Sequence, residues 1–131
     1  MERKPEDIVK MNLYQKINAL RVDFLNSGIQ KTGKNTHLEY KFYTLDDIVP
    51  VLLPLNEKYG LTTITSFANG VASLTVTDTH AEDFNHVVFE ADLVELIQKG
   101  MNAPQAAGSV QTYYRRYLYI MYLDIVEHEL S

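Results

Sequence analysis

The stretch 61-LTTITSFANGVASLTVTDTHAEDFNHVVFEA-91 has the clearest secondary-structure pattern in this chain. It begins with two runs of β-forming residues, 61–68 and 71–78, which are separated by Asn69 and Gly70. Because Asn and Gly both accept positive φ, this pair between two strand patterns is typical of a tight hairpin turn. The stretch therefore predicts an antiparallel β-hairpin.

Alternation along the strands predicts one buried face and a third strand. In the second run Ala72, Leu74 and Val76 alternate with hydroxyl residues. Successive side chains of a strand point to opposite faces, so the apolar set should be buried. After a polar turn, residues 84–91 repeat the pattern, with Val87, Phe89 and Ala91 facing one way.

Helical patterns flank this sheet on both sides. Residues 6–27 carry apolar side chains at helical spacings, with Pro5 at a permitted first-turn position and Gly28 as a stop, which predicts one long amphipathic helix. Residues 28–41 read as a basic loop that leads into a short strand at 38–43.

A second, shorter helix is expected from Thr44 to Tyr59, before Gly60. Thr44 is a suitable N-cap, and the two acids that follow it suit the positive end of a helix dipole. Pro54 should kink or break this helix.

The last helix is expected over 104–126, after an ambiguous segment at 92–103. The predicted fold class is α+β, with an antiparallel β-β-β-α core, an N-terminal long helix and a second short helix packed around a small sheet. We expect one domain over 1–131, with flexible ends at 1–5 and 127–131.

Composition restricts the function classes. Of 131 residues 46% are apolar, and the chain contains no cysteine, which excludes disulfides and thiolate metal sites. It has neither an apolar span of membrane length nor a signal peptide, so we expect a cytoplasmic protein that does not enter membranes. The net charge is -5, yet residues 1–41 hold eight of the twelve Lys and Arg against five acids.

The last helix combines an apolar stripe with a polar face. The polar face carries Ser109, Thr112 and Arg116, with Arg115 on the neighbouring side; small hydroxyl residues and guanidinium groups suit contact with phosphate. A two-Arg run on a helix is more often a solvated or salt-bridged face, so the two arginines could instead pair with some of the seventeen acids. We expect Tyr119 and Tyr122 to meet bases or a neighbouring subunit. The stripe that should pack on the sheet consists of Val110, Tyr113, Tyr114, Tyr117 and Met121.

From Gln105 to Tyr117 the chain reads Q-A-A-G-S-V-Q-T-Y-Y-R-R-Y, preceded by Met101, Asn102 and Pro104. This segment resembles the Q-x-x-G-S-x-x-T-Y-x-R-R-Y signature of the ERF family of phage-type single-strand annealing proteins. Further matches, in the family's order, are Ile17, Val22 and Ser27-Gly28-Ile29, then Tyr40-Lys41 with Leu45-Asp46-Asp47-Ile48, and Lys58-Tyr59-Gly60-Leu61.

The resemblance implies a protein that binds single-stranded DNA and pairs complementary strands without ATP or another cofactor. It also implies a β-β-β-α core, a homo-oligomeric ring or filament, and a host or phage single-strand binding protein as a further partner. Two departures are the acidic net charge and an end at Ser131, where the family usually continues. The candidate DNA-binding residues are Lys31, Lys34, Lys41, Ser109, Thr112, Arg115 and Arg116.

Two other classes of protein stay open. A metal-dependent nuclease could use Asp46 and Asp47 with a histidine, although the four histidines show no metal-ligand spacing and the two acids are also explained as helix-start charges. An oligomeric interaction protein could keep the fold without binding DNA, which the acidic charge allows. We expect no enzyme activity.

Overall fold

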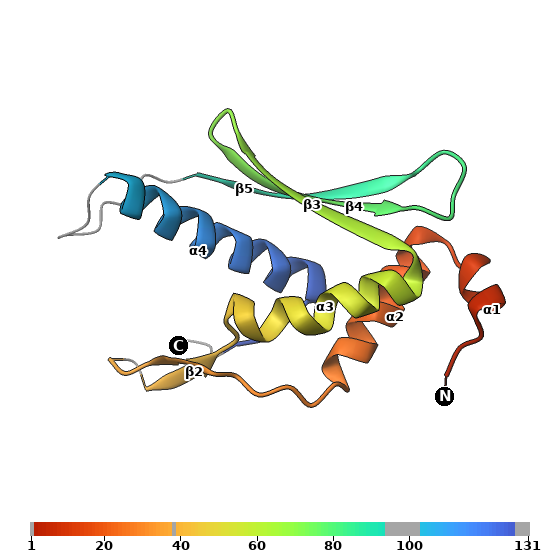
Figure 1. Ribbon diagram of the computed structural model, residues 1–131, viewed down its shortest axis with the longest axis horizontal. Helices are drawn as coiled ribbons and strands as arrows, with labels where there is room; N and C mark the ends of the chain where they lie inside the picture. Colours follow the sequence, from red (N-terminus) through yellow and green to blue (C-terminus); the bar gives the residue numbers. More distant parts are fainter. Residues whose placement is uncertain (1, 38, 94–102, 128–131) are drawn as a thin grey trace.

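The computed structural model describes residues 2–37, 39–93 and 103–127, and it confirms the α+β class. The strands form two β-sheets, one of three strands and one of two. Helices pack on these sheets (Figure 1). The elements in chain order are α1 (Pro5–Val9), α2 (Leu13–Leu25), β1 (Gly33–Asn35), β2 (Tyr40–Phe42), α3 (Leu45–Tyr59), β3 (Leu61–Ala68), β4 (Val71–Asp78), β5 (His86–Asp92) and α4 (Ala103–Leu123).

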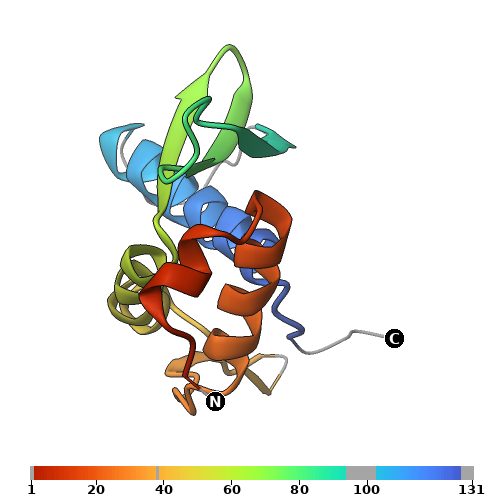
Figure 2. The same cartoon turned by 90° about the vertical axis from the view of Figure 1, so that its right-hand side faces the viewer.

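The three-stranded sheet has the order β3-β4-β5, and both pairings are antiparallel. The hairpin at Asn69 and Gly70 is confirmed, since both residues have positive φ and the strands run over the predicted residues. Helix α4 crosses one face of the sheet, and α2 and α3 lie on the other side of α4 (Figures 1 and 2). Among the described elements, none covers the opposite face of the sheet in these views.

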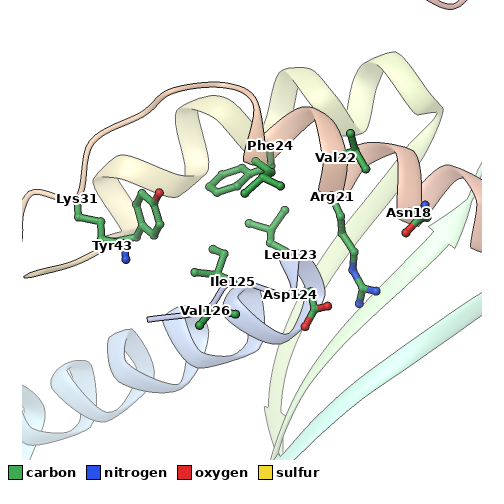
Figure 3. A pocket seen from close by; sticks show the side chains of 11 residues that line it. Asn18, Arg21, Val22, Phe24, Lys31, Tyr43, Leu123, Asp124, Ile125 and Val126 are labelled. Atoms are coloured by element: carbon green, nitrogen blue, oxygen red, sulfur yellow. The ribbon is translucent and has the colours of Figure 1, made fainter. Parts of the chain in front are cut away.

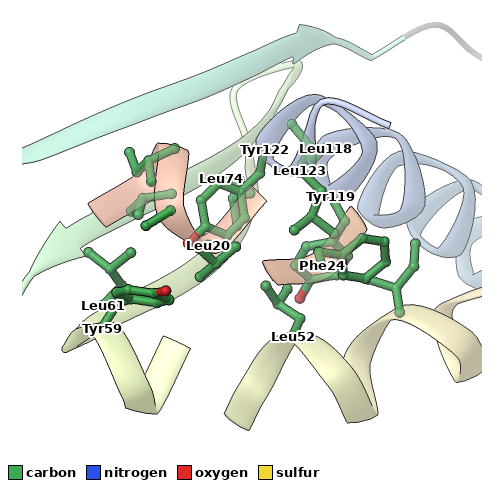
Figure 4. Close-up of a cluster of buried hydrophobic side chains, with 14 of the residues drawn as sticks. Leu20, Phe24, Leu52, Tyr59, Leu61, Leu74, Leu118, Tyr119, Tyr122 and Leu123 are labelled. Atoms are coloured by element: carbon green, nitrogen blue, oxygen red, sulfur yellow. The ribbon is translucent and has the colours of Figure 1, made fainter. Parts of the chain in front are cut away.

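The core fills the space between the sheet, α4, α2 and α3 (Figure 4). The predicted inner face of β4 is confirmed, because Ala72, Leu74 and Val76 are fully buried. From α4, Leu118 and Tyr122 are fully buried as well. The Tyr122 hydroxyl donates to Asn56 Oδ1 at 2.9 Å, and Asn56 Nδ2 donates to Thr63 Oγ1 at 3.1 Å. This chain of hydrogen bonds satisfies polar groups that burial would otherwise penalise.

The single helix predicted over 6–27 is wrong, because the chain forms α1 and α2 with a break between them. Asn12 causes the break. Its side chain accepts from Gln15 N, and the Gln15 side chain accepts from Asn12 N, each at 2.8 Å. This capping box starts a new helix at Leu13, and it outweighs the continuous apolar spacing.

Part of the loop predicted before the short strand forms a strand. Residues 33–35 form β1 and pair with β2 in a small antiparallel hairpin. The predicted strand at 38–43 corresponds to Tyr40–Phe42, while residue 38 lies outside the described residues. Strands of three residues are too short for an alternation pattern to reveal them.

Helix α3 confirms both predicted ends but not the predicted break. Thr44 forms a capping box with Asp47, and Gly60 ends the helix with φ of 66°. The helix nevertheless runs through Pro50 and Pro54 without interruption. Both prolines are exposed, so water can satisfy the carbonyls that they leave unbonded, while buried side chains hold the opposite face.

The remaining boundaries differ by two or three residues. The third strand begins at His86 rather than at residue 84, because Phe84 has φ of 47° in the preceding turn. Helix α4 ends at Leu123 rather than at 126, because Asp124 has φ of 54°. Most of the ambiguous segment at 92–103 lies outside the described residues. Within the described part, no helix is long and apolar enough to cross a bilayer.

Candidate nucleic-acid interface

The β1–β2 hairpin places two of the predicted cations opposite each other. Lys34 and Lys41 are cross-strand partners, and both are exposed. Directly opposite residues of an antiparallel pair point to the same face, with Cβ atoms about 4.5–5.5 Å apart, and like charges in this position are destabilising. The hairpin therefore tolerates a repulsion that an anion bound between the two ammonium groups would relieve.

The hairpin is fastened to the start of α3 by Asp47. Thr32, just before β1, donates to the Asp47 carboxylate from its backbone N at 3.0 Å and from Oγ1 at 2.7 Å. Thr44 N donates to the same carboxylate at 2.9 Å. Partial burial raises the pKa of Asp47, but the hydrogen bonds from Thr32 and Thr44 outweigh it and leave the pKa below its usual value. Asp47 thus stays charged and holds the base of the hairpin.

Arg116 of α4 reaches this hairpin through Phe42. Its guanidinium carbon lies 4.6 Å from the centroid of the Phe42 ring, within the range of a cation–π contact. Phe42 is itself packed over Gly33, where an added Cβ would lie 2.4 Å from the ring. Lys41 and Phe42 are successive residues of β2, so their side chains point to opposite faces of the hairpin. Arg116 therefore contacts the inner face, and Lys34 and Lys41 lie on the outer face of the same hairpin.

Arg116 also forms an ion pair. Its Nη2 lies 2.9 Å from Glu127 Oε1, and Glu127 Oε2 accepts from Tyr43 N at 2.9 Å. The acid pairing considered from the sequence is therefore correct for Arg116. Glu127 belongs to the end segment that was expected to be flexible, and the other residues of that segment, 128–131, lie outside the described residues.

Arg115 points elsewhere. Its guanidinium carbon lies 6.0 Å from the Tyr119 ring centroid, and its buried Nε has no hydrogen-bond partner among the described residues. Of the two hydroxyl residues on the polar face of α4, Thr112 donates to Gly108 O at 3.0 Å, and Ser109 is half-buried. The Thr112 proton is thus used within the helix, which leaves its oxygen as an acceptor.

Lys31 lies at a pocket next to the hairpin (Figure 3). Its Nζ is 5.2 Å from the centroid of the Tyr43 ring. The pocket has a volume of about 390 Å³, and its apolar lining comes from α2 and from the residues that follow α4. Lys31 is therefore held against Tyr43, beside the Lys34–Lys41 pair but not within it.

The predicted roles of the tyrosines in α4 are partly wrong. Tyr113 and Tyr117, expected in the core, are 48% and 47% exposed, whereas Tyr119 and Tyr122, expected outside it, are buried. Tyr114 is buried as predicted. The core stripe is Tyr114, Leu118 and Tyr122, because at 3.6 residues per turn these positions face the sheet and α3 together.

The two acids considered for a nuclease, Asp46 and Asp47, lie in the first turn of α3. Asp47 is occupied by Thr32 and Thr44, and Asp46 is exposed in the first turn of α3. Across the described ranges, no group of three His, Asp or Glu side chains is gathered in a way that could hold a metal ion.

Sequence reasoning missed Phe42 and Gly33, which carry the contact between α4 and the hairpin. It also missed a buried ion pair between Lys16 and Asp78, whose Nζ and Oδ1 atoms are 2.6 Å apart. A polar residue on the otherwise apolar face of β4, Asp78 after Leu74 and Val76, was the available signal for this pair.

Comparison with known protein families agrees with the signature in α4. The model of the ERF superfamily matches residues 13–129, which is most of the chain. The chain belongs to the ERF superfamily. Membership implies a role in phage-type recombination and single-strand annealing, and ERF annealing proteins are generally not enzymes. No curated protein and no solved structure matched the chain.

Proposed function

We propose that this ERF protein binds single-stranded DNA by its phosphate groups and anneals complementary strands without ATP. The observation that carries the proposal is the pairing of Lys34 with Lys41 across the hairpin, whose other face contacts Arg116 through Phe42. In the described part of the chain, neither lysine has a carboxylate within ion-pair distance. Two exposed and unneutralised cations on one face favour a polyanion.

The chemistry of the three side chains suits annealing. Lysine and arginine bind phosphate groups without reading the base, so binding tolerates any sequence. An annealing protein also needs the base edges to remain free, because the second strand must pair with them. We place Ser109 and Thr112 on the α4 face beside Arg116, and Lys31 and Arg115 at the margins of the site.

Assembly of several copies would reconcile DNA binding with the net charge of -5. In an assembly, the three cations of each subunit repeat along the DNA strand. The overall affinity then exceeds that of one subunit, although each contact is weak. Strand β3 offers a route to assembly, because it is an edge strand of eight residues with neither a charged residue nor a proline. Such edges pair readily with another strand. We propose that β3 joins a strand of a second copy, in a ring or filament.

The test replaces Lys34 and Lys41 by Gln and measures binding to a labelled single strand of mixed sequence over a range of salt concentrations. Each lost phosphate contact should make the log-log salt slope less negative by about 0.7, and the loss should be the same for all base sequences. The matched control is Lys4→Gln with Lys10→Gln, which removes two exposed lysines near α1, at the other end of the molecule (Figure 1).

The same samples test annealing and assembly. Complementary strands should pair without ATP. Light scattering should show complexes that contain more than one protein subunit when DNA is present. Shortened strands after addition of Mg²⁺ would favour the nuclease instead. An assembly that does not bind DNA would favour the interaction protein, and a monomer that ignores DNA would likewise overturn the proposal.

A further inference from the structure

Two tyrosine rings stack on each other on the outside of α4. The centroids of Tyr113 and Tyr117 are 5.8 Å apart, and their planes meet at 27°. Both side chains are about half exposed, and Tyr113 also makes an edge contact with the buried Tyr114. The pair is therefore an aromatic surface that is open to solvent on one side and contacts the buried Tyr114 on the other.

This surface adjoins the proposed phosphate site. At about 100° per residue, Tyr113 and Tyr117 lie roughly 60° and 100° around the helix from Arg116, in the same rotational sense. They are three residues before Arg116 and one residue after it, so both lie within about one turn of it along the helix axis. A strand whose phosphate is bound by Arg116 would have its bases within reach of these rings.

We propose that Tyr113 and Tyr117 form a stacking platform for unpaired bases of the bound strand. This inference rests on the proposed function. A base inserted between the two rings would need about twice the 3.4 Å rise of stacked bases, roughly 7 Å. The rings are closer than that, so the bases stack on the outward-facing ring surfaces.

Stacking suits annealing because it uses the face of a base and leaves its pairing edge free. It is also tolerant of sequence, since every base has a π-face. In duplex DNA these faces are covered by neighbouring base pairs. The platform therefore gives the protein a preference for single strands, which phosphate contacts alone do not supply.

The experiment uses a double variant that carries both Tyr113→Leu and Tyr117→Leu. Its binding to two DNA strands of equal length is compared with that of wild type. One strand carries all its bases and the other carries abasic sites. Wild type should bind the abasic strand at least about fivefold more weakly, and the variant should bind both strands equally. The salt slope of the variant should equal that of wild type, because no phosphate contact is lost. Tyr14→Leu is the matched control, an exposed tyrosine of α2.

A second measurement does not depend on the double variant. The chain contains no tryptophan, so Tyr117→Trp introduces a single tryptophan, which is excited at longer wavelength than the tyrosines. Its emission should be quenched by the strand with bases and not by the abasic strand.

The inference is overturned if wild type binds the abasic strand as tightly as the normal one, or if the double variant changes only the subunit number. In the latter case the rings belong to a subunit interface. These results are distinguishable from failure of the proposed function, in which wild type binds neither strand and Lys34→Gln has no effect.

Discussion

Lysines in two regions of this protein have opposite surroundings. Lys16 of α2 is fully buried, with its Nζ 2.6 Å from Asp78 Oδ1 and 2.9 Å from His80 Nδ1. Lys34 and Lys41 are exposed, and each has the other lysine as its cross-strand neighbour. The first lysine is neutralised inside the fold, and the other two are left to be neutralised from outside.

Burial and pairing distinguish structural cations from candidate ligand-binding ones. A buried charge must have a partner, because transfer out of water is costly. Exposed charges of the same sign have no such requirement, and placing them opposite each other lowers stability without any gain inside the fold. We therefore attribute a structural role to Lys16 and propose a binding role for the hairpin lysines.

The largest effect is expected from Asp78→Asn, which leaves the buried Lys16 ammonium unpaired. The free energy of unfolding should fall by about 3–5 kcal/mol, measured by urea denaturation. The affinity of the remaining folded protein for DNA should not change. Adding Lys16→Met should recover part of the stability. A single variant as stable as wild type would contradict the structural role of the Lys16–Asp78 pair.

Gly33→Ala should disturb the contact between the hairpin and Arg116. The new Cβ would lie 2.4 Å from the Phe42 ring, so the ring must move, at a cost of about 1–3 kcal/mol. Arg116 would lose its stacking partner, and the affinity for single strands should fall. Gly108→Ala is the control, because nothing lies within 4 Å of its added Cβ. Equal DNA affinities of the two variants would contradict the role of Phe42.

Glu127→Gln should increase binding. It removes the carboxylate that lies 2.9 Å from Arg116 and competes with phosphate for the guanidinium group. We expect the affinity for single strands to rise a few-fold and the salt slope to become more negative by about 0.7, as measured by a binding titration. An unchanged slope would show that Arg116 does not contact phosphate.

The smallest expected effect is a gain in stability. Lys41→Gln removes a like charge from the position opposite Lys34, so the free energy of unfolding should rise by about 0.2–1 kcal/mol in low salt. The gain should disappear in high salt, since salt screens exposed charges. Thermal unfolding at two salt concentrations measures both, and a loss of stability in low salt would refute the assignment.

The sheet and its neighbours were predictable because their signals are local. Asn69-Gly70, the Thr44 cap and Gly60 each fix a backbone conformation through one or two residues, and the structure has all three as predicted. The Asn12 capping box was equally local, with Gln15 three residues on, and could have been found.

The candidate site was predictable in composition but not in geometry. The sequence shows a basic segment and an Arg pair, yet the contact between Arg116 and Phe42 depends on packing of residues 74 positions apart. The assignment of Tyr113 and Tyr117 to the core failed for a related reason. Several stripes on α4 are apolar, and only the packing of the sheet and α3 selects the one that is buried.

The link between α2 and the end of α4 has a consequence for synthesis of the protein. Arg21 Nε donates to Tyr122 O at 2.7 Å and Nη2 donates to Met121 O at 3.3 Å, so an early residue caps the last helix across 101 positions. Contacts of such long range form late, and a nascent chain adds about 5–20 residues per second. Ribosome-bound chains that lack α4 should therefore remain sensitive to protease until that helix has left the exit tunnel.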